Sequence, residues 1–90
     1  MSNKRELKKI INSVCEQLFA ECLAASLYEP CPDQETVNTL LSSILLLRDD
    51  YVARISHPEP GMPPKRYYDI LQQDFKKHVG ELIDQVQGLA

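Results

Sequence analysis

Three cysteines and two histidines could ligate a metal: Cys15, Cys22, Cys31, His57 and His78. Cys15 and Cys22 share one helical face, but seven residues place them about 10 Å apart along a helix axis. Sulfurs that bind one zinc ion lie much closer, because each Zn–S bond is about 2.3 Å long. Cys31 and His57 fall at opposite ends of a predicted helix. We therefore expect no metal site, and we expect Cys15 and Cys22 to be small core residues.

Cys31 is the thiol with the most reactive setting. It lies between two prolines just before a predicted helix, whose N-terminus would lower the pKa of a thiol, whereas the neighbouring acidic residues would raise it. The chain has no CxxC pair, so an ordinary loop thiol is the simpler interpretation.

His78 is the candidate general base, with Asp74 one helical turn before it. Counting through antiparallel hairpins places it roughly level with Ser43 and Phe19. The glycines, Gly61, Gly80 and Gly88, are too far apart for a phosphate-binding loop. We expect no catalytic and no cofactor-binding residue, and an enzyme or redox protein using His78 or Cys31 is the weakest hypothesis.

Three helices are predicted to position these side chains, over residues 3–28, 33–56 and 64–88. Apolar residues recur at three- and four-residue steps throughout, and no alternating strand pattern occurs. Asn3 and Asp33 can cap the first two helices, and Pro64 suits the first turn of the third. Two short connections predict an all-α, antiparallel, up-down-up three-helix bundle formed by residues 1–90 as one domain.

Three prolines and a glycine separate the second and third predicted helices, and a fourth proline, Pro64, begins the third. Residues 60–65, PGMPPK, match the PxxPxK spacing that SH3-type domains bind. A structured corner stiffened by proline is the simpler interpretation. The docking motif stays open as the alternative.

The amino-acid composition limits the classes of protein to which the chain can belong. Hydrophobic residues make up 43% of the 90 residues, charged residues 26%, and the formal net charge is -3. This profile is typical of a globular domain with no general attraction to nucleic acid or anionic membrane. The most apolar run, residues 40–47, is far shorter than the ~20 residues that span a bilayer. The N-terminus does not resemble a secretory signal, and an odd number of cysteines favours a reducing cytoplasm.

Basic residues cluster at the starts of the first and third helices, which share one end of the predicted bundle. Tyr67 and Tyr68 beside them offer stacking surfaces. An anionic ligand or a nucleic acid at this end is the alternative function, although we expect no nucleic-acid binding. The residues are Lys4, Arg5, Lys8, Lys9, Lys65 and Arg66.

Arg48 interrupts the apolar stripe of the second helix. The antiparallel register places it level with Gln72 and Asp69, so we expect a buried polar contact with them.

The first helix carries a second apolar row, Ala20, Leu23, Ala24 and Leu27, at i, i+3, i+4 and i+7. A bundle needs one stripe per helix, so this row should face solvent in a monomer. The leading hypothesis is therefore a non-enzymatic protein–protein interaction or self-association module, paired through this row as a homodimer.

Overall fold

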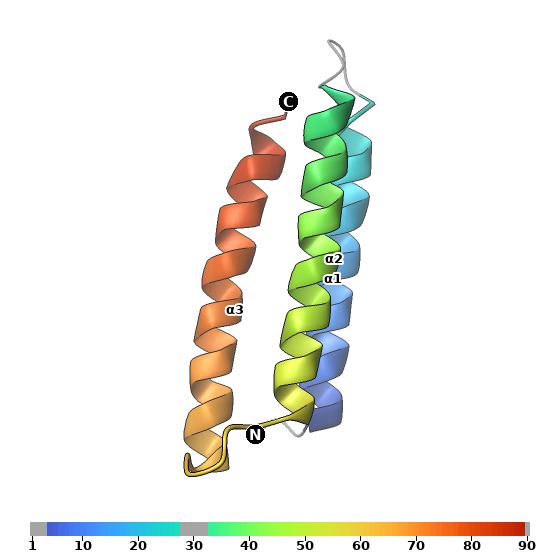
Figure 1. Ribbon diagram of the computed structural model, residues 1–90. Helices are drawn as coiled ribbons and strands as arrows, with labels where there is room; N and C mark the ends of the chain where they lie inside the picture. The colour runs from blue at the N-terminus through green and yellow to red at the C-terminus, as the bar shows by residue number, and fades with distance from the viewer. Residues whose placement is uncertain (1–3, 28–32, 90) are drawn as a thin grey trace.

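A computed structural model describes residues 4–27 and 33–89, which form an all-α, up-down-up bundle (Figure 1). The helices are α1 (Lys4–Ala25), α2 (Gln34–Ser56) and α3 (Pro64–Gln87). Their bounds agree with the sequence prediction to within three residues, and no strand occurs in the described ranges. The predicted cap Asn3 and the thiol of Cys31 lie outside the described residues.

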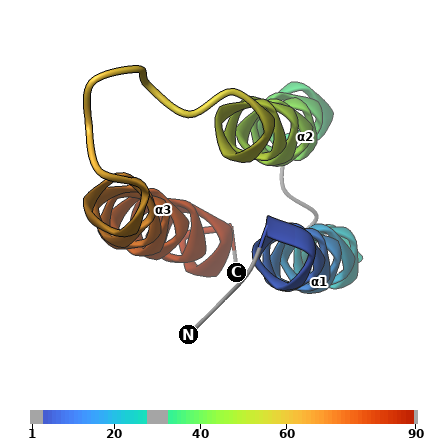
Figure 2. The same cartoon turned by 90° about the horizontal axis from the view of Figure 1, so that it is seen from below.

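The core is formed by the apolar stripes that the sequence pattern predicts. Each helix turns its stripe towards a common interior, and the end-on view shows the helices arranged around it (Figure 2). Tyr51 is the largest fully buried side chain, and the centroid of its ring lies 5.2 Å from the centroid of the Phe75 ring. The buried positions are Leu7, Ile11, Cys15, Leu18, Cys22, Ala25, Val37, Leu40, Ile44, Tyr51, Ile55, Leu71, Phe75, Leu82 and Val86.

Local sequence signals fix where α2 and α3 begin. The Asp33 carboxylate accepts hydrogen bonds from the Thr36 backbone N–H at 3.3 Å and from the Thr36 hydroxyl at 3.2 Å. This satisfies a backbone donor that the first turn of a helix leaves without a partner. Pro64 occupies the first turn of α3, where its missing N–H removes no helical hydrogen bond.

The proline-rich segment between α2 and α3 is a structured corner, as the sequence predicts. Gly61 has φ +89°, and the Met62 N–H donates to the Glu59 carbonyl at 3.5 Å. A proline followed by a glycine with positive φ is typical of a type II turn, which here starts at Glu59.

Two tyrosines of α3 hold this corner to the end of α2. The Tyr67 hydroxyl donates to the Arg54 carbonyl at 2.9 Å, and the Tyr68 hydroxyl donates to the Ile55 carbonyl at 3.2 Å. These carbonyls belong to the last turn of α2, whose acceptors have no partner within the helix. Both hydroxyls therefore serve the fold.

Candidate functional site

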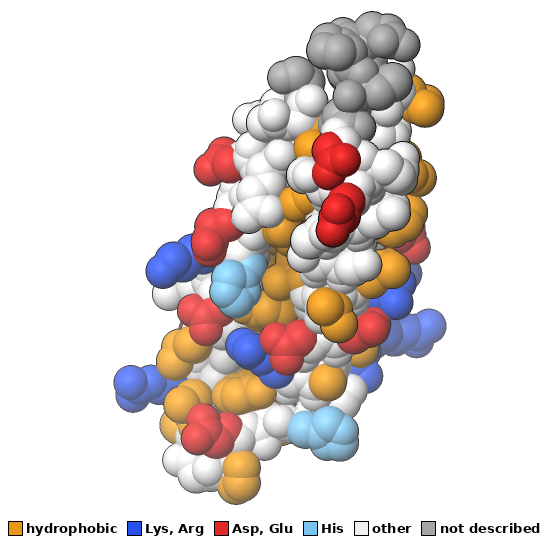
Figure 3. Space-filling model, turned by 45° about the horizontal axis from the view of Figure 1, so that its top comes forward, with side chains coloured by type: hydrophobic (Ala, Val, Ile, Leu, Met, Phe, Trp, Pro, Cys, Tyr) orange, Lys and Arg blue, Asp and Glu red, His pale blue; other side chains and the backbone are white. Residues whose placement is uncertain are grey.

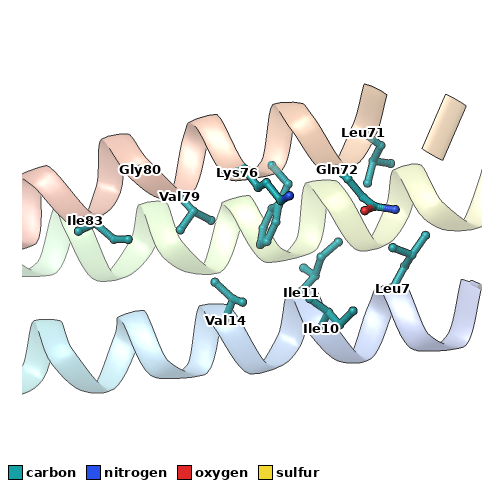
Figure 4. A pocket seen from close by; sticks show the side chains of 11 residues that line it. Leu7, Ile10, Ile11, Val14, Leu71, Gln72, Lys76, Val79, Gly80 and Ile83 are labelled. Atoms are coloured by element: carbon teal, nitrogen blue, oxygen red, sulfur yellow. The ribbon is translucent and has the colours of Figure 1, made fainter. Parts of the chain in front are cut away.

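The seam between α1 and α3 is open along part of its length. A groove of about 280 Å³ lies between the two helices, and their side chains point into it (Figure 4). α1 packs most extensively against α2 and least against α3, which explains why this seam is the open one. The groove is lined by Leu7, Ile10, Ile11 and Val14 of α1 and by Leu71, Gln72, Phe75, Lys76, Val79, Gly80 and Ile83 of α3.

The walls of the groove are apolar, with few polar groups. Ile10 of α1 remains 52% exposed although it flanks the core residue Ile11. Among the lining residues Lys76 alone is charged. Gly80 interrupts the α3 wall, and no atom lies within 4 Å of the position that a Cβ would take there. The groove therefore offers apolar surface and close access to the helix backbone, which is the kind of surface an apolar partner buries.

The row Ala20, Leu23, Ala24 and Leu27 faces away from the core, as its spacing predicts. Leu23 is 43% exposed and Leu27 is 78% exposed, and both alanines are exposed as well. α3 does not cover the row. Whether a second copy covers it stays a prediction.

One polar pair bridges α2 and α3. The Tyr51 hydroxyl lies 2.7 Å from Nδ1 of His78, and the two rings meet edge to face with centroids 5.7 Å apart. The Arg54 guanidinium lies over the Tyr51 ring, 4.7 Å from its centroid. Burial raises the pKa of Tyr51, an effect that Arg54 opposes and Asp74 and Asp50 reinforce. Sequence reasoning missed this pair, although a buried tyrosine hydroxyl usually has a hydrogen-bond partner.

His78 and Ser43 line the same shallow depression between α2 and α3, but the partner of His78 is Tyr51, about two helical turns from the expected Ser43. His78 and Ser43 do not form a nucleophile–base pair. The Ser43 hydroxyl donates to the Thr39 carbonyl at 2.9 Å, and His78 is engaged by Tyr51. The geometry of a general base next to a hydroxyl nucleophile is therefore not present at this position.

Cys15 and Cys22 are both buried in the core, and burial raises the pKa of each thiol. For Cys15 the nearby positive charge of Arg48 opposes this effect. A raised pKa keeps a thiol protonated and unreactive at neutral pH. Within residues 4–27 and 33–89, no three His, Cys, Asp or Glu side chains come together as a metal site would require.

The structure corrects the expected contact of Arg48. Its guanidinium lies 3.1 Å from the Asp49 carboxylate, and its side chain remains 38% exposed. Gln72 is half-buried and Asp69 is exposed, and neither contacts Arg48. The charge of Arg48 is close enough to Cys15 of α1 to act on its thiol, while the half-buried side chain reaches the surface and pairs there with Asp49.

The six clustered basic residues lie at the end of the bundle where α1 and α3 begin (Figure 1). Five of them are exposed, and Lys8 is half-buried. The rings of Tyr67 and Tyr68 contact each other, with centroids 5.4 Å apart, and both hydroxyls are used by the corner. The tyrosines thus have a structural role beside the stacking role that the sequence allows.

The PxxPxK stretch is only partly extended. Pro60 and Gly61 form a turn, and Pro64 and Lys65 already belong to α3. A ligand of an SH3-type domain binds as an extended polyproline II helix. Binding there would require the first turn of α3 to unwind.

Comparison with models of protein families, with curated proteins and with solved structures finds no match to this chain. None of the three described helices combines the length and the apolar character needed to cross a membrane.

Proposed function

We propose that this chain is a non-enzymatic protein–protein interaction module that binds through the groove between α1 and α3. The observation that carries this proposal is the open seam, which leaves apolar side chains such as Ile10, Val79 and Ile83 accessible between two helices. Apolar side chains of a partner helix, spaced at i, i+3 or i+4, and i+7, are the natural occupants of a groove with helical walls. The exposed row of α1 described above is the sequence-predicted alternative surface.

Site-specific photo-cross-linking in the native cell tests the proposal. A benzophenone side chain replaces Ile10, and the same group replaces Asn38, an exposed residue on the outer face of α2, as the matched control. We expect a discrete protein adduct from position 10 and none from position 38. Equal labelling from both positions, or none from either, would contradict a binding role for the groove.

A second candidate function is supported by one observation, the gathering of six basic residues at a single end of the bundle. Two helix N-termini lie at that end and add partial positive charge to it. An anionic ligand or a nucleic acid is the partner that this end would attract. An electrophoretic shift assay with short RNA or DNA tests this candidate function.

A further inference from the structure

The lysines and arginines are confined to one half of the bundle, whereas acidic side chains occur in both halves. α1 has no lysine or arginine after Lys9, α2 has none before Arg48, and α3 has none after Lys77. These three stretches lie at the same end, because α2 runs opposite to α1 and α3 (Figure 1). On the face in Figure 3 the upper part shows acidic side chains and no lysine or arginine. We define the acidic end by Glu21, Asp33, Glu35, Glu81 and Asp84, and the basic end by the six clustered basic residues.

The groove lies between these two ends. On α1, Glu21 follows Val14 by seven residues and extends the same wall towards the acidic end. On α3, Lys65 precedes Gln72 by seven residues and extends the other wall towards the basic end. Asp69 is an acidic residue on that wall, seven residues before Lys76. The face that carries the groove is therefore apolar in the middle and oppositely charged at its two extremities.

We propose that a second copy of this chain occupies the groove, antiparallel to the first, about a two-fold axis that crosses the groove near its middle. This inference rests on the proposed function, because it names the partner of the same groove. The two-fold operation brings the basic end of each copy against the acidic end of the other. A parallel pair would place like charges together at both ends, which disfavours that arrangement.

The dimensions of the bundle exclude an end-to-end contact between opposite charges. The bundle measures 50 × 19 × 16 Å, so an end offers about 300 Å² and a long side about 950 Å². A stable interface buries about 800 Å² on each partner. Only a contact along the length of the molecule reaches that area.

Gly80 and Ile10 suit this contact. Glycine within a helix is destabilising relative to alanine, and nothing in the chain itself occupies the space that Gly80 leaves. A partner backbone can approach α3 closely there, and Ile10 becomes buried in the same step. By contrast, pairing the row Ala20, Leu23, Ala24 and Leu27 with itself would bring two acidic ends side by side.

The first experiment measures mass by light scattering at tens of micromolar protein. We expect a particle of twice 10.3 kDa at low salt, and weaker association as salt screens the charged ends. A strictly monomeric mass overturns the second copy as the occupant. If Ile10 still cross-links to a different protein in that case, the proposed function stands and only the self-association fails.

The second experiment exchanges the charges. One variant carries Glu21→Lys with Asp84→Lys, and the other carries Lys4→Glu with Lys65→Glu. We expect each variant alone to dissociate roughly tenfold more readily, because like charges then meet at both ends. An equimolar mixture should recover a dimer, since the two variants complement each other.

Two controls complete this experiment. Asn38→Lys with Ser42→Lys adds positive charge on α2, away from the groove, and should leave the dimer intact; circular dichroism verifies that every variant folds. A dimer that ignores both charge exchanges overturns the antiparallel arrangement. The variant Leu23→Glu with Leu27→Glu tests the row of α1. If this variant loses the dimer and both charge variants keep it, the dimer uses that row, and the antiparallel arrangement through the groove is overturned.

Discussion

The hydroxyl of Tyr51 and Nδ1 of His78 lie 2.7 Å apart, although Tyr51 is fully buried and His78 is exposed. A neutral His78 with its proton on Nε2 accepts this hydrogen bond at Nδ1. The pair therefore satisfies a buried hydroxyl with a side chain that is itself hydrated. It also joins α2 to α3 through His78, which follows Tyr68 of the corner by ten residues.

This arrangement predicts unequal effects for the two partners. Tyr51→Phe removes the buried hydroxyl and leaves His78 in water, so unfolding free energy should fall by only about 0.5–1.5 kcal/mol. His78→Ala leaves the buried hydroxyl without this acceptor and should cost about 1–3 kcal/mol. Urea denaturation of both single variants and the double variant measures the coupling. Additive effects in this cycle would mean that the two groups do not interact in solution.

Stability should decrease in alkaline solution because burial raises the pKa of Cys15, Cys22 and Tyr51. Above the ordinary thiol pKa of 9.0 the unfolded chain loses protons that the native chain keeps, and Tyr51 adds to this above 10.0. Each group then lowers the free energy of unfolding by up to about 1.4 kcal/mol per pH unit, until the folded pKa is reached. Below about pH 8 the three groups contribute almost no pH dependence, because both states then keep their protons.

Urea unfolding at pH 7, 9 and 10 measures this loss. Cys22→Ala provides the control, since it removes one of the titrating groups and should make the decline between pH 9 and 10 shallower, whatever its effect at pH 7. A free energy of unfolding that stays constant from pH 7 to pH 10 would contradict the burial of these groups.

Two glycines should respond to alanine with opposite signs. Gly61 has φ +89°, where an alanine side chain is strained, so Gly61→Ala should cost roughly 1 kcal/mol. Gly80 is helical and has open space at the Cβ position, so Gly80→Ala should add about 0.5–1 kcal/mol.

Both glycine changes are best made in the Lys4→Glu, Lys65→Glu chain, at a protein concentration where light scattering shows a monomer. Thermal unfolding then reports the effect of each change on the stability of the monomer, without a contribution from association. In the wild-type chain the added methyl group of Gly80→Ala should weaken association, so stability and dimerisation move in opposite directions. Stabilisation with unchanged or stronger association would show that no partner approaches α3 at this position.

The periodicity of apolar residues was sufficient to predict the three helices, their order and most of the core. In a short antiparallel bundle the apolar stripe of each helix has only one place to go, which is towards the common core. The turn at Pro60 and Gly61 and the cap at Asp33 are equally local, and so they too could be predicted from residue type. The register between neighbouring helices, which decides which of their residues lie side by side, could not be predicted to the same accuracy. The partner of His78 is Tyr51, about two helical turns from the expected Ser43.

Arg48 and the groove show why the remaining details were not predictable. Angular position on α2 placed Arg48 within the apolar arc, but it does not show whether a long side chain stays inside or leaves along a seam. The open seam between α1 and α3 depends on how far α3 lies from α1. The corner and its two tyrosine hydrogen bonds fix the start of α3 beside the end of α2, and the stripes alone do not encode that position.

The basic end provides the last prediction, since it is the sequence feature that favours an anionic partner. If it binds polyanions, Lys65→Glu with Arg66→Glu should abolish binding to short RNA or DNA in an electrophoretic shift assay. Lys76→Glu with Lys77→Glu makes the same change of charge farther along α3 and serves as the matched control. Binding should also weaken steeply with added salt, because each phosphate contact releases counterions.

We expect no shift of the wild-type chain even at low salt, because the net charge is -3 and the hydroxyls of Tyr67 and Tyr68 are engaged by α2. A salt-sensitive shift that the Lys65, Arg66 variant loses and the control keeps would overturn this expectation and establish the basic end as a polyanion site.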